Sequence, residues 1–339
     1  MQKILVTGGA GFIGSCFVRT QLRNYPDQHV VVLDKLTYSG NLDNLKGLDE
    51  TRISFIRGDV NNPEHVRHAL EGCDGAVHFA AESHVDRSLS GASDFIATNV
   101  GGVNTLLSQA RAMNLERILL VSTDEVYGSV TDGSSKEDSP ILPRNPYSAS
   151  KASGELIGLS YFESFCMPVI ITRGSNTYGP YQYPEKVLPL FISNAIDNEP
   201  LPLYGDGRNV RDWLFVEDHC AGIDCAFRKG TPGEAYNIAG ENERENITLT
   251  RKVLSLLNRP DTLIRYIEDR TGHDRRYSID STKLKALGWE PKMNFDEGIA
   301  FTVKWYQENE WWWRKIKSGE FKAYYEEHYR ERLDKSQGI

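Results

Sequence analysis

Two adjacent carboxyl groups follow an apolar run near the middle of the chain, in the segment ILLVSTDEVYG at residues 118–128. The apolar run 118–121 predicts a buried strand, and Asp124 and Glu125 lie where it ends. Burying carboxylates at the mouth of a core strand costs free energy unless they are paired or used in chemistry. Such a pair can supply a general acid and a general base. Taken alone, the motif fits a solvated acidic turn equally well.

A glycine-rich loop opens the sequence. KILVTGGAGFIG places Gly9, Gly11 and Gly14 in G-x-G-x-x-G register between a predicted strand and a predicted helix, which suits a pyrophosphate at a helix N-terminus. The next strand, HVVVLD, ends in Asp34, whose carboxylate can bind the ribose hydroxyls of NAD and would repel the phosphate of NADP. The alternative for Asp34 is a solubilising acid at a strand end. The residues assigned to NAD are Gly8, Gly11, Phe12, Ile13, Gly14, Asp34, Lys35, Leu36, Thr37, Asp59, Val60, Ala80, Ala81, Thr98, Tyr147 and Lys151.

A tyrosine and a lysine share one face of a predicted helix. NPYSASKASGE contains Tyr147 and Lys151 at positions i and i+4. The phenol is a poor base at neutral pH, but a neighbouring ammonium and a positive nicotinamide ring would stabilise its phenolate. Such a phenolate can remove a proton from a substrate hydroxyl while the cofactor oxidises the carbon. By itself the pair also fits a surface contact.

The elements that must position these residues alternate between strands and helices. Strands are predicted at 3–7, 29–34, 53–57, 75–79, 117–122 and 168–173, with helices at 14–24, 63–71, 94–113 and 146–165. This alternation predicts an α/β fold, a Rossmann-type doubly wound parallel sheet with a smaller, partly interleaved α/β lobe. We expect residues 1–176 to form the NAD-binding domain, with about 212–240 returning to it. Residues 177–339 form the second lobe and a helical tail that packs Trp and Tyr onto the body.

Composition excludes several classes of protein. A net charge of −8 and a pI near 5.6 argue against a nucleic-acid or anionic-membrane binder. The five cysteines form no CxxC pair or metal-ligand cluster, so we expect reduced thiols, no metal site and a cytoplasmic protein. The sequence opens without a basic-then-apolar leader and contains no apolar run of ~18 residues, so neither a signal peptide nor a membrane span is expected.

Four features together resemble the extended short-chain dehydrogenase/reductase family: TGGAGFIG, the strand-end Asp34, STDEVYG and YSASK. The segments DKLTYSGNLDNL, AAESHVDRS, SNTYGPYQYPEK, RDWLFVEDH and DRTGHDRRY resemble its nucleotide-sugar 4,6-dehydratases, in order from Met1 to about Trp289. The resemblance implies NAD as cofactor and dTDP-glucose as substrate, with dTDP-4-keto-6-deoxyglucose as product. It also implies a homodimer formed through a helix bundle, to which residues 94–113 and 147–165 are plausible contributors.

The resemblance also implies roles for the strand-end residues. Oxidation at C4 of the sugar acidifies the C5–H bond, so Glu125 is the base at C5 and Asp124 the acid at the C6 hydroxyl. Thr123 donates a hydrogen bond near the C4 oxygen. Asp124 must then keep a proton at neutral pH, which requires burial and its neighbour's charge to raise its pKa. Related epimerases typically carry small residues at these two positions. An epimerase or decarboxylase, or a non-catalytic NAD-sensing protein, remains the alternative.

The second lobe must neutralise two phosphate charges with local basic residues. Arginine suits forked phosphate contacts, and Arg211, Arg270, Arg275, Arg276 and Lys186 are the candidates. Any one of them could instead form a surface ion pair. The resemblance implies that Ser83 lies near the sugar and that the nucleotide diphosphate is bound by Asn176, Arg211, Asn246, Arg270 and His273. The residues assigned to the substrate are Ser83, Thr123, Asn176, Lys186, Arg211, Asn246, Arg270 and His273. A preference for thymidine over uridine rests on the resemblance only.

Overall fold

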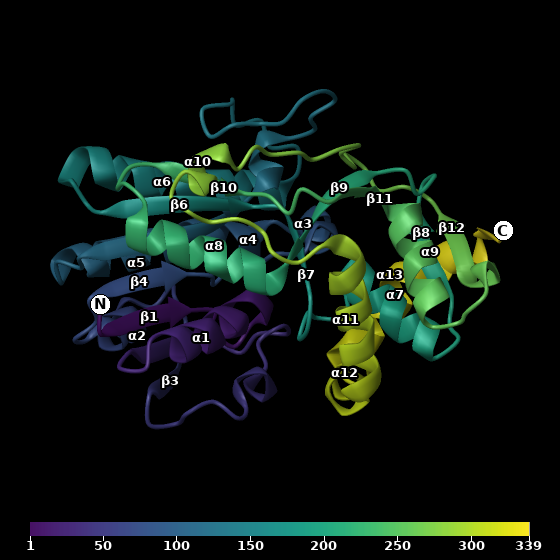
Figure 1. Ribbon diagram of the computed structural model, residues 1–339, viewed down its shortest axis with the longest axis horizontal. Coiled ribbons are helices and arrows are strands. Elements are labelled where there is room, and N and C mark those ends of the chain that lie inside the picture. Colours follow the sequence, from purple (N-terminus) through teal and green to yellow (C-terminus); the bar gives the residue numbers. More distant parts are fainter. Residues whose placement is uncertain (339) are drawn as a thin grey trace.

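A seven-stranded sheet, parallel throughout, forms the larger lobe of the computed structural model, which describes residues 1–338 (Figure 1). The strand order is β10-β6-β5-β4-β1-β2-β3, so the chain reverses direction across the sheet between β1 and β4. The strands are β1 (Lys3–Thr7), β2 (His29–Asp34), β3 (Ile53–Arg57), β4 (Gly75–His78), β5 (Arg117–Thr123), β6 (Val169–Gly174) and β10 (Ala235–Ile238).

Helices cover both faces of this sheet, which is why its strands are almost continuously apolar. Alternate residues of β1 enter opposite cores: Ile4 and Val6 pack on one face and Leu5 on the other. Helices α1 and α8 cover the first face, and α2, α5 and α6 cover the second. The doubly wound prediction is therefore confirmed. The helices are α1 (Phe12–Asn24), α2 (Pro63–Leu70), α3 (Val85–Ser90), α4 (Ser93–Ile96), α5 (Val103–Ala112), α6 (Pro146–Phe165) and α8 (Val216–Lys229).

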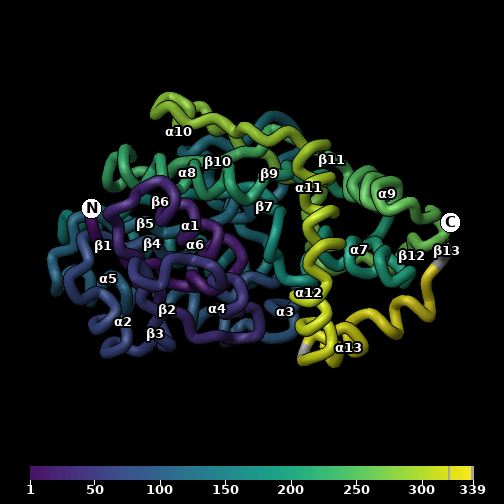
Figure 2. Tube along the Cα trace, turned by 60° about the horizontal axis from the view of Figure 1, so that its bottom comes forward, coloured from purple at the N-terminus to yellow at the C-terminus, as the bar shows by residue number. Residues whose placement is uncertain are grey.

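The second lobe contains two three-stranded sheets and a separate aromatic core. Trp312, Trp313 and Phe321 are buried in that core, so the tail packs as predicted, whereas Trp311 stays exposed. Figure 2 shows α11, α12 and α13 following one another along this lobe. Its elements are β7 (Asn176–Tyr178), α7 (Val187–Ile196), β8 (Leu201–Tyr204), β9 (Val210–Phe215), β11 (Glu243–Glu245), α9 (Asn246–Leu256), β12 (Ile264–Ile267), α11 (Phe295–Glu308), α12 (Glu310–Lys317), α13 (Glu320–Asp334) and β13 (Gln337–Gly338).

The chain passes between the lobes more than once. After β6 it builds β7, α7 and β8 of the second lobe, then returns as α8 and β10, and β10 is the edge strand of the large sheet. It leaves again for α9 and β12, and the short helix α10 (Thr282–Lys285) lies against β10 on the way back. The boundaries 1–176, 212–240 and 177–339 stay a prediction. None of the helices within residues 1–338 is long and apolar enough to cross a membrane.

The predicted helix 94–113 is not a single α-helix. A π-helical segment, Ala97–Gly102, separates α4 from α5. Asn99 in this segment is buried, and its side chain accepts from Glu82 N at 2.9 Å while donating to Glu82 O at 3.0 Å and Ser150 Oγ at 2.8 Å. Apolar spacing does not distinguish the two helix types over so short a stretch. The contacts of Asn99 tie this segment to the loop after β4 and to α6.

Candidate active site

A cavity of about 1170 Å³ runs along the carboxyl ends of the central strands and between the two lobes. Parallel strands deliver their loops to this edge, where ligands bind in open α/β sheets. Leu36, Arg211, Asn246, Arg270 and His273 are absent from the lining that residues 1–338 provide. The predicted residues that do line the cavity are Gly8, Gly11, Phe12, Ile13, Gly14, Asp34, Lys35, Thr37, Asp59, Val60, Ala80, Ala81, Ser83, Thr98, Thr123, Asp124, Glu125, Tyr147, Lys151, Asn176 and Lys186.

The glycine loop forms a backbone cradle between β1 and α1. Gly8 has a φ of +68°, and a Cβ placed there would lie 2.7 Å from the backbone nitrogen of Ala80. A Cβ at Gly14 would collide with the carbonyl oxygen of Gly8. Gly11 precedes the first turn of α1, whose N–H groups and positive dipole end suit a pyrophosphate. Glycine at these positions therefore permits the tight turn, and the free N–H groups at the start of α1 suit a dinucleotide.

Asp34 ends β2 as a buried carboxyl group that can accept further hydrogen bonds. Its Oδ2 accepts from Ala10 N at 3.0 Å and its Oδ1 from Leu36 N at 2.8 Å. Burial raises the pKa of Asp34, and these two amide donors oppose that rise. Each oxygen keeps a lone pair for a ribose hydroxyl. Leu36 has a φ of +57° and donates its amide to Asp34, although it was predicted to bind the cofactor and is not among the described residues that line the cavity.

Helix α6 presents Tyr147 and Lys151 to the cavity. Asn145 caps the helix, with its side chain accepting from Ser148 N at 2.8 Å. Lys151 donates from Nζ to the carbonyl of Val121 in β5 at 2.7 Å, and burial lowers its pKa to about 8. Burial and the nearby charge of Glu125 raise the pKa of Tyr147 well above its ordinary value. The phenol is therefore protonated in this structure, and a phenolate needs further positive charge.

The two strand-end carboxyl groups have different surroundings. Asp124 is 3% exposed, and its Oδ1 accepts a hydrogen bond from Thr123 Oγ1 at 3.2 Å. Its Oδ2 has no partner among the described residues. Burial, followed by the charge of Glu125, raises the pKa of Asp124 well above its ordinary value. Glu125 is only partly buried, and its Oε2 accepts from Asn145 Nδ2 at 3.4 Å and Tyr277 OH at 3.5 Å. A buried carboxyl group with a raised pKa thus lies beside a partly exposed carboxyl group.

Comparison with known proteins identifies the family. A model of the GDP-mannose 4,6 dehydratase family matches residues 5–302. The chain belongs to this 4,6-dehydratase family. It is 51% identical over 306 residues to the low-salt glycan biosynthesis protein Agl12 of Haloferax volcanii, covering 90% of this chain and 98% of that protein. It is 46% identical over 323 residues to the dTDP-glucose 4,6-dehydratase of Streptomyces niveus, covering 94% and 96%.

Solved structures agree with this 4,6-dehydratase membership. DesIV, the dTDP-glucose 4,6-dehydratase of Streptomyces venezuelae with NAD and TYD bound, is 49% identical with a TM-score of 0.92, covering 93% of this chain and all of that one. The Thermus thermophilus UDP-glucose 4-epimerase with NAD reaches a TM-score of 0.85 at 29% identity, covering 91% and 100%. The backbone alone therefore does not separate dehydratases from epimerases.

Two of the predicted arginines of this 4,6-dehydratase, Arg211 and Arg270, are not among the described residues that line the cavity. Arg211 is buried, donates to the carbonyls of Val210 at 2.7 Å and Asp274 at 2.9 Å, and lies 4.3 Å above the ring of Tyr277. Arg270 forms an ion pair with Asp86. Burial lowers the pKa of Arg211, whereas the charge of Asp86, followed by that of Glu125, outweighs burial and raises the pKa of Arg270.

Four other residues were predicted to bind the substrate: Lys186, Asn176, Asn246 and His273. Lys186 Nζ donates to the carbonyl of Ser83 at 2.7 Å, at the cavity wall. The amide oxygens of Asn176 and Asn246 are buried without a partner among the described residues. His273 is not among the described lining residues, and it bonds to Asp269 Oδ1 at 2.6 Å. Within residues 1–338, no three His, Cys, Asp or Glu side chains are grouped so that they could hold a metal ion.

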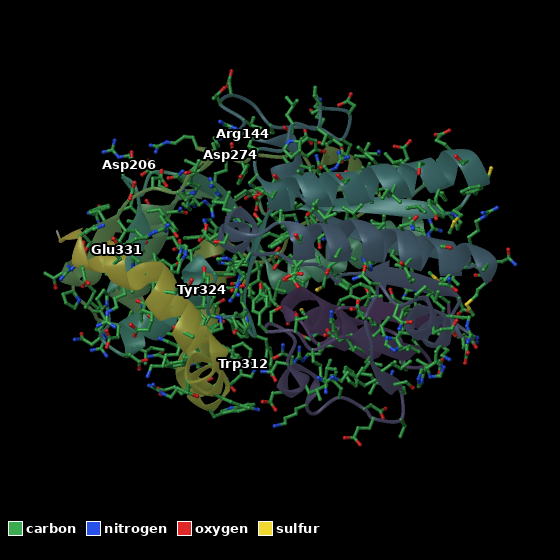
Figure 3. The ribbon with its side chains drawn as sticks, turned by 180° about the vertical axis from the view of Figure 1, so that it is seen from behind. Arg144, Asp206, Asp274, Trp312, Tyr324 and Glu331 are labelled. Atoms are coloured by element: carbon green, nitrogen blue, oxygen red, sulfur yellow. The ribbon has the colours of Figure 1, made fainter. Side chains whose placement is uncertain are left out.

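Helix α13 supplies cavity residues that sequence reasoning missed. The guanidinium carbon of Arg87 lies 4.2 Å from the centre of the Tyr324 ring. The Tyr324 ring also stacks on the ring of His328, with the two ring centres 5.3 Å apart. Figure 3 shows α13 from behind, with Tyr324 and Glu331 along it. The i, i+4 spacing of aromatic and basic residues in the tail was a signal, but we predicted only packing. The cavity-lining residues of α13 are Tyr324, Glu327, His328, Glu331 and Arg332.

Proposed function

We propose that the chain is an NAD-dependent dTDP-glucose 4,6-dehydratase that produces dTDP-4-keto-6-deoxyglucose. The observation that carries the proposal is the pair Asp124 and Glu125 in one cavity with Tyr147 and Lys151. An epimerase needs no second acid and base, whereas removal of water across C5 and C6 needs both. The family membership, the named dTDP-glucose 4,6-dehydratase relatives and the NAD-bound dehydratase structures support the same activity.

Each residue then has a defined task. Bound NAD supplies reversible oxidation at C4 and a positive ring that favours the Tyr147 phenolate. Tyr147 takes the proton of the C4 hydroxyl, and Thr123 donates a hydrogen bond to the same oxygen. Glu125 removes the C5 proton, which the C4 carbonyl has acidified, and Asp124 protonates the departing C6 hydroxyl so that water leaves. Glu125 then returns a proton to C5 as C6 receives the hydride that left C4, so the product is a 4-keto-6-deoxy sugar and the turnover consumes no cofactor.

The reaction can be tested in heavy water. Purified protein incubated with dTDP-glucose in deuterium oxide, without added NAD, should yield a keto product with deuterium at C5 and no net NADH. The isotope position is read by NMR and the NADH by absorbance. Glu125→Gln should block C5 exchange more than it weakens substrate binding. A product that keeps its C6 hydroxyl would contradict the dehydratase proposal.

Which nucleotide the substrate carries is a separate question from the reaction type and needs a separate experiment. The family model is named for GDP-mannose, whereas curated relatives are named for dTDP-glucose. We propose dTDP-glucose, and competition among dTDP-glucose, UDP-glucose and GDP-mannose at equal concentrations measures the preference. Preferential turnover of GDP-mannose would retain the chemistry and overturn the substrate.

We also propose a cytoplasmic homodimer. The five free cysteines support a reducing compartment. The helices α4 and α6 expose large apolar side chains, with Ile96 59% exposed and Leu156 57% exposed, as expected of a surface that a partner covers. Light scattering should give twice the 38.3 kDa of one chain, and Leu156→Glu should shift the mass toward one chain. A monomeric wild-type protein would contradict the dimer.

A further inference from the structure

Asp86, on α3, is a buried carboxylate beside the cavity that the proposed reaction does not use. It is 7% exposed, and its Oδ1 accepts from Arg270 Nη1 at 3.1 Å. Arg270 follows β12, so this ion pair joins two segments that are 184 residues apart in the chain. Asp86 is not among the described residues that line the cavity. Because its side chain is only 6% exposed, Asp86 can act on a bound substrate only through a more exposed neighbour.

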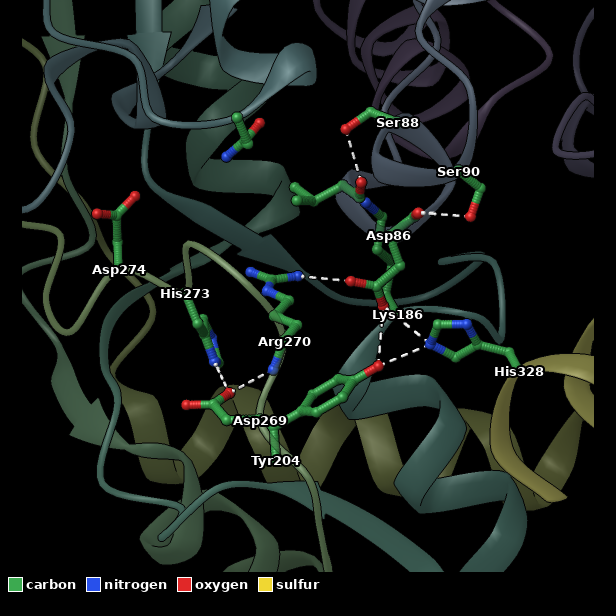
Figure 4. A network of polar contacts seen from close by, with 12 residues as sticks. Asp86, Ser88, Ser90, Lys186, Tyr204, Asp269, Arg270, His273, Asp274 and His328 are labelled. Atoms are coloured by element: carbon green, nitrogen blue, oxygen red, sulfur yellow. Dashed lines mark hydrogen bonds and ion pairs between the residues drawn. The ribbon is translucent and has the colours of Figure 1, made fainter. Parts of the chain in front are cut away.

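Two residues of the second lobe hold the other oxygen of Asp86. Tyr204 OH, at the end of β8, donates to Oδ2 at 3.1 Å, and His328 Nε2 of α13 lies 3.4 Å from the same atom (Figure 4). Tyr204 OH and His328 Nε2 are 2.7 Å apart. Burial raises the pKa of Asp86, but His328 and the charge of Arg270 outweigh it and hold the pKa well below its ordinary value. The carboxylate is therefore ionised and fixed on both sides.

The guanidinium of Arg270 keeps unused donors. Within the described chain, Asp86 is the only hydrogen-bond partner of its side chain, although guanidinium carries five N–H groups. Its side chain is 19% exposed. Burial, followed by the positive charges of Arg270 and Arg211, lowers the pKa of His273 to about 4, so His273 adds no positive charge beside the two arginines. A second edge of Arg270 is free to bind a phosphate in a forked contact.

We propose that Asp86, held by Tyr204 and His328, is a positioning residue that aims the free edge of Arg270 at the diphosphate of the substrate. The inference rests on the proposed function, because that function supplies the diphosphate. It also assigns α13 a role in binding, since His328 comes from a helix outside the residues that the family model matches. A rigid carboxylate behind a charged contact reduces the motion that binding must freeze.

Calorimetry of four proteins tests the inference: wild type, Asp86→Asn, Arg270→Gln and the double variant, each as purified holoenzyme. The probes are dTDP, which carries the diphosphate, and thymidine, which lacks it. We expect Asp86→Asn to weaken dTDP binding about tenfold and thymidine binding less than about twofold. In the Arg270→Gln background, Asp86→Asn should cause no further loss. His328→Gln should weaken dTDP binding in the same direction.

A matched control is Asp197→Asn, which removes an aspartate from an ion pair with Arg314 (2.8 Å) outside the cavity. It should leave dTDP binding unchanged. Equal losses for dTDP and thymidine, additive losses in the double variant, or tighter dTDP binding by Asp86→Asn would each overturn the inference. Wild-type turnover of dTDP-glucose is measured in parallel. If the wild type is active and Asp86→Asn binds dTDP as tightly as the wild type, only the inference is contradicted. If the wild type binds no dTDP, the proposed function is contradicted as well.

Discussion

At the residue scale, neighbouring carboxyl groups of similar chemistry are separated by their surroundings. Asp124 points into a buried site with one hydroxyl donor, whereas Glu125 is partly exposed and contacts Asn145 and Tyr277. A buried carboxyl group beside a negative charge favours its proton-bearing form. The proposed roles of Asp124 as proton donor and Glu125 as proton acceptor agree with this difference in burial.

Replacing Asp124 tests this difference. Asp124→Asn removes the transferable proton but preserves shape, so we expect kcat to fall ~100-fold or more while dTDP binding stays within about twofold. Steady-state kinetics and calorimetry measure the two quantities. Unchanged turnover would contradict the assignment of Asp124 as the acid.

The same variant should change how stability depends on pH. The unfolded chain releases the Asp124 proton near pH ~4, but the folded chain retains it because its pKa is raised. Folded wild type thus binds more protons, and its free energy of unfolding falls as pH rises above ~4 until the raised pKa is passed. The Asp124→Asn variant has no carboxyl group at this position, so its free energy of unfolding does not fall with pH for this reason. Its melting temperature relative to wild type should increase between pH 4 and pH 7, and a constant difference would contradict the raised pKa.

Local motifs made much of the site predictable. Four features each lie within a short segment, where the spacing of the residues predicts their relative positions. They are the glycine loop, Asp34, the Thr-Asp-Glu run and the Tyr147–Lys151 pair. Asp86 and the cavity residues of α13 were not predictable in this way. Asp86 meets Tyr204 and Arg270 across 118 and 184 residues, and only the packed lobes bring them together.

At the element scale, the π-helical segment 97–102 depends on a close approach to α6. A Cβ at Gly154 would lie 2.7 Å from the carbonyl oxygen of Asn99. The glycine thus lets α6, which carries Tyr147 and Lys151, pack tightly against the segment that holds the loop after β4. The sequence predicted helices at both places, but the register between them is set by these tertiary contacts.

Gly154→Ala should disturb that packing. The added methyl group forces α6 away from Asn99, so we expect a loss of ~1–3 kcal/mol in the free energy of unfolding and a lower kcat. Urea denaturation and steady-state kinetics measure the two effects. Gly91→Ala, where a Cβ meets no atom within 4 Å, is the control and should be close to neutral. A neutral Gly154→Ala would show that the packing is loose.

At the scale of the whole molecule, the two lobes have unequal parts in binding. The NAD-contacting residues predicted here all lie at or before residue 151, whereas α13 closes the cavity from the second lobe. Phe321 and Tyr329 of α13 are buried in the aromatic core of that lobe. The helix is thus both a structural element and a wall of the cavity.

Truncation after Ser318 should separate these parts. Loss of Phe321 and Tyr329 lowers the melting temperature by several degrees or more, at ~2–4 °C for each kcal/mol in a chain of this size. Loss of Tyr324 and His328 should raise KM for dTDP-glucose while NAD stays bound. The ratio of NAD to protein after gel filtration checks the last point. Loss of NAD together with substrate affinity would contradict a division of binding between the lobes.

The interleaved path of the chain affects when the enzyme becomes competent during synthesis. A nascent chain that has emerged through residue 240 already contains all seven strands of the large sheet, but the wall contributed by α13 needs residues up to Arg332. Domains tend to fold as they leave the ribosome, so the dinucleotide cradle can form first. Incomplete chains would then bind the cofactor but would lack the cavity wall that α13 supplies. Such chains would not catalyse the reaction before synthesis is complete.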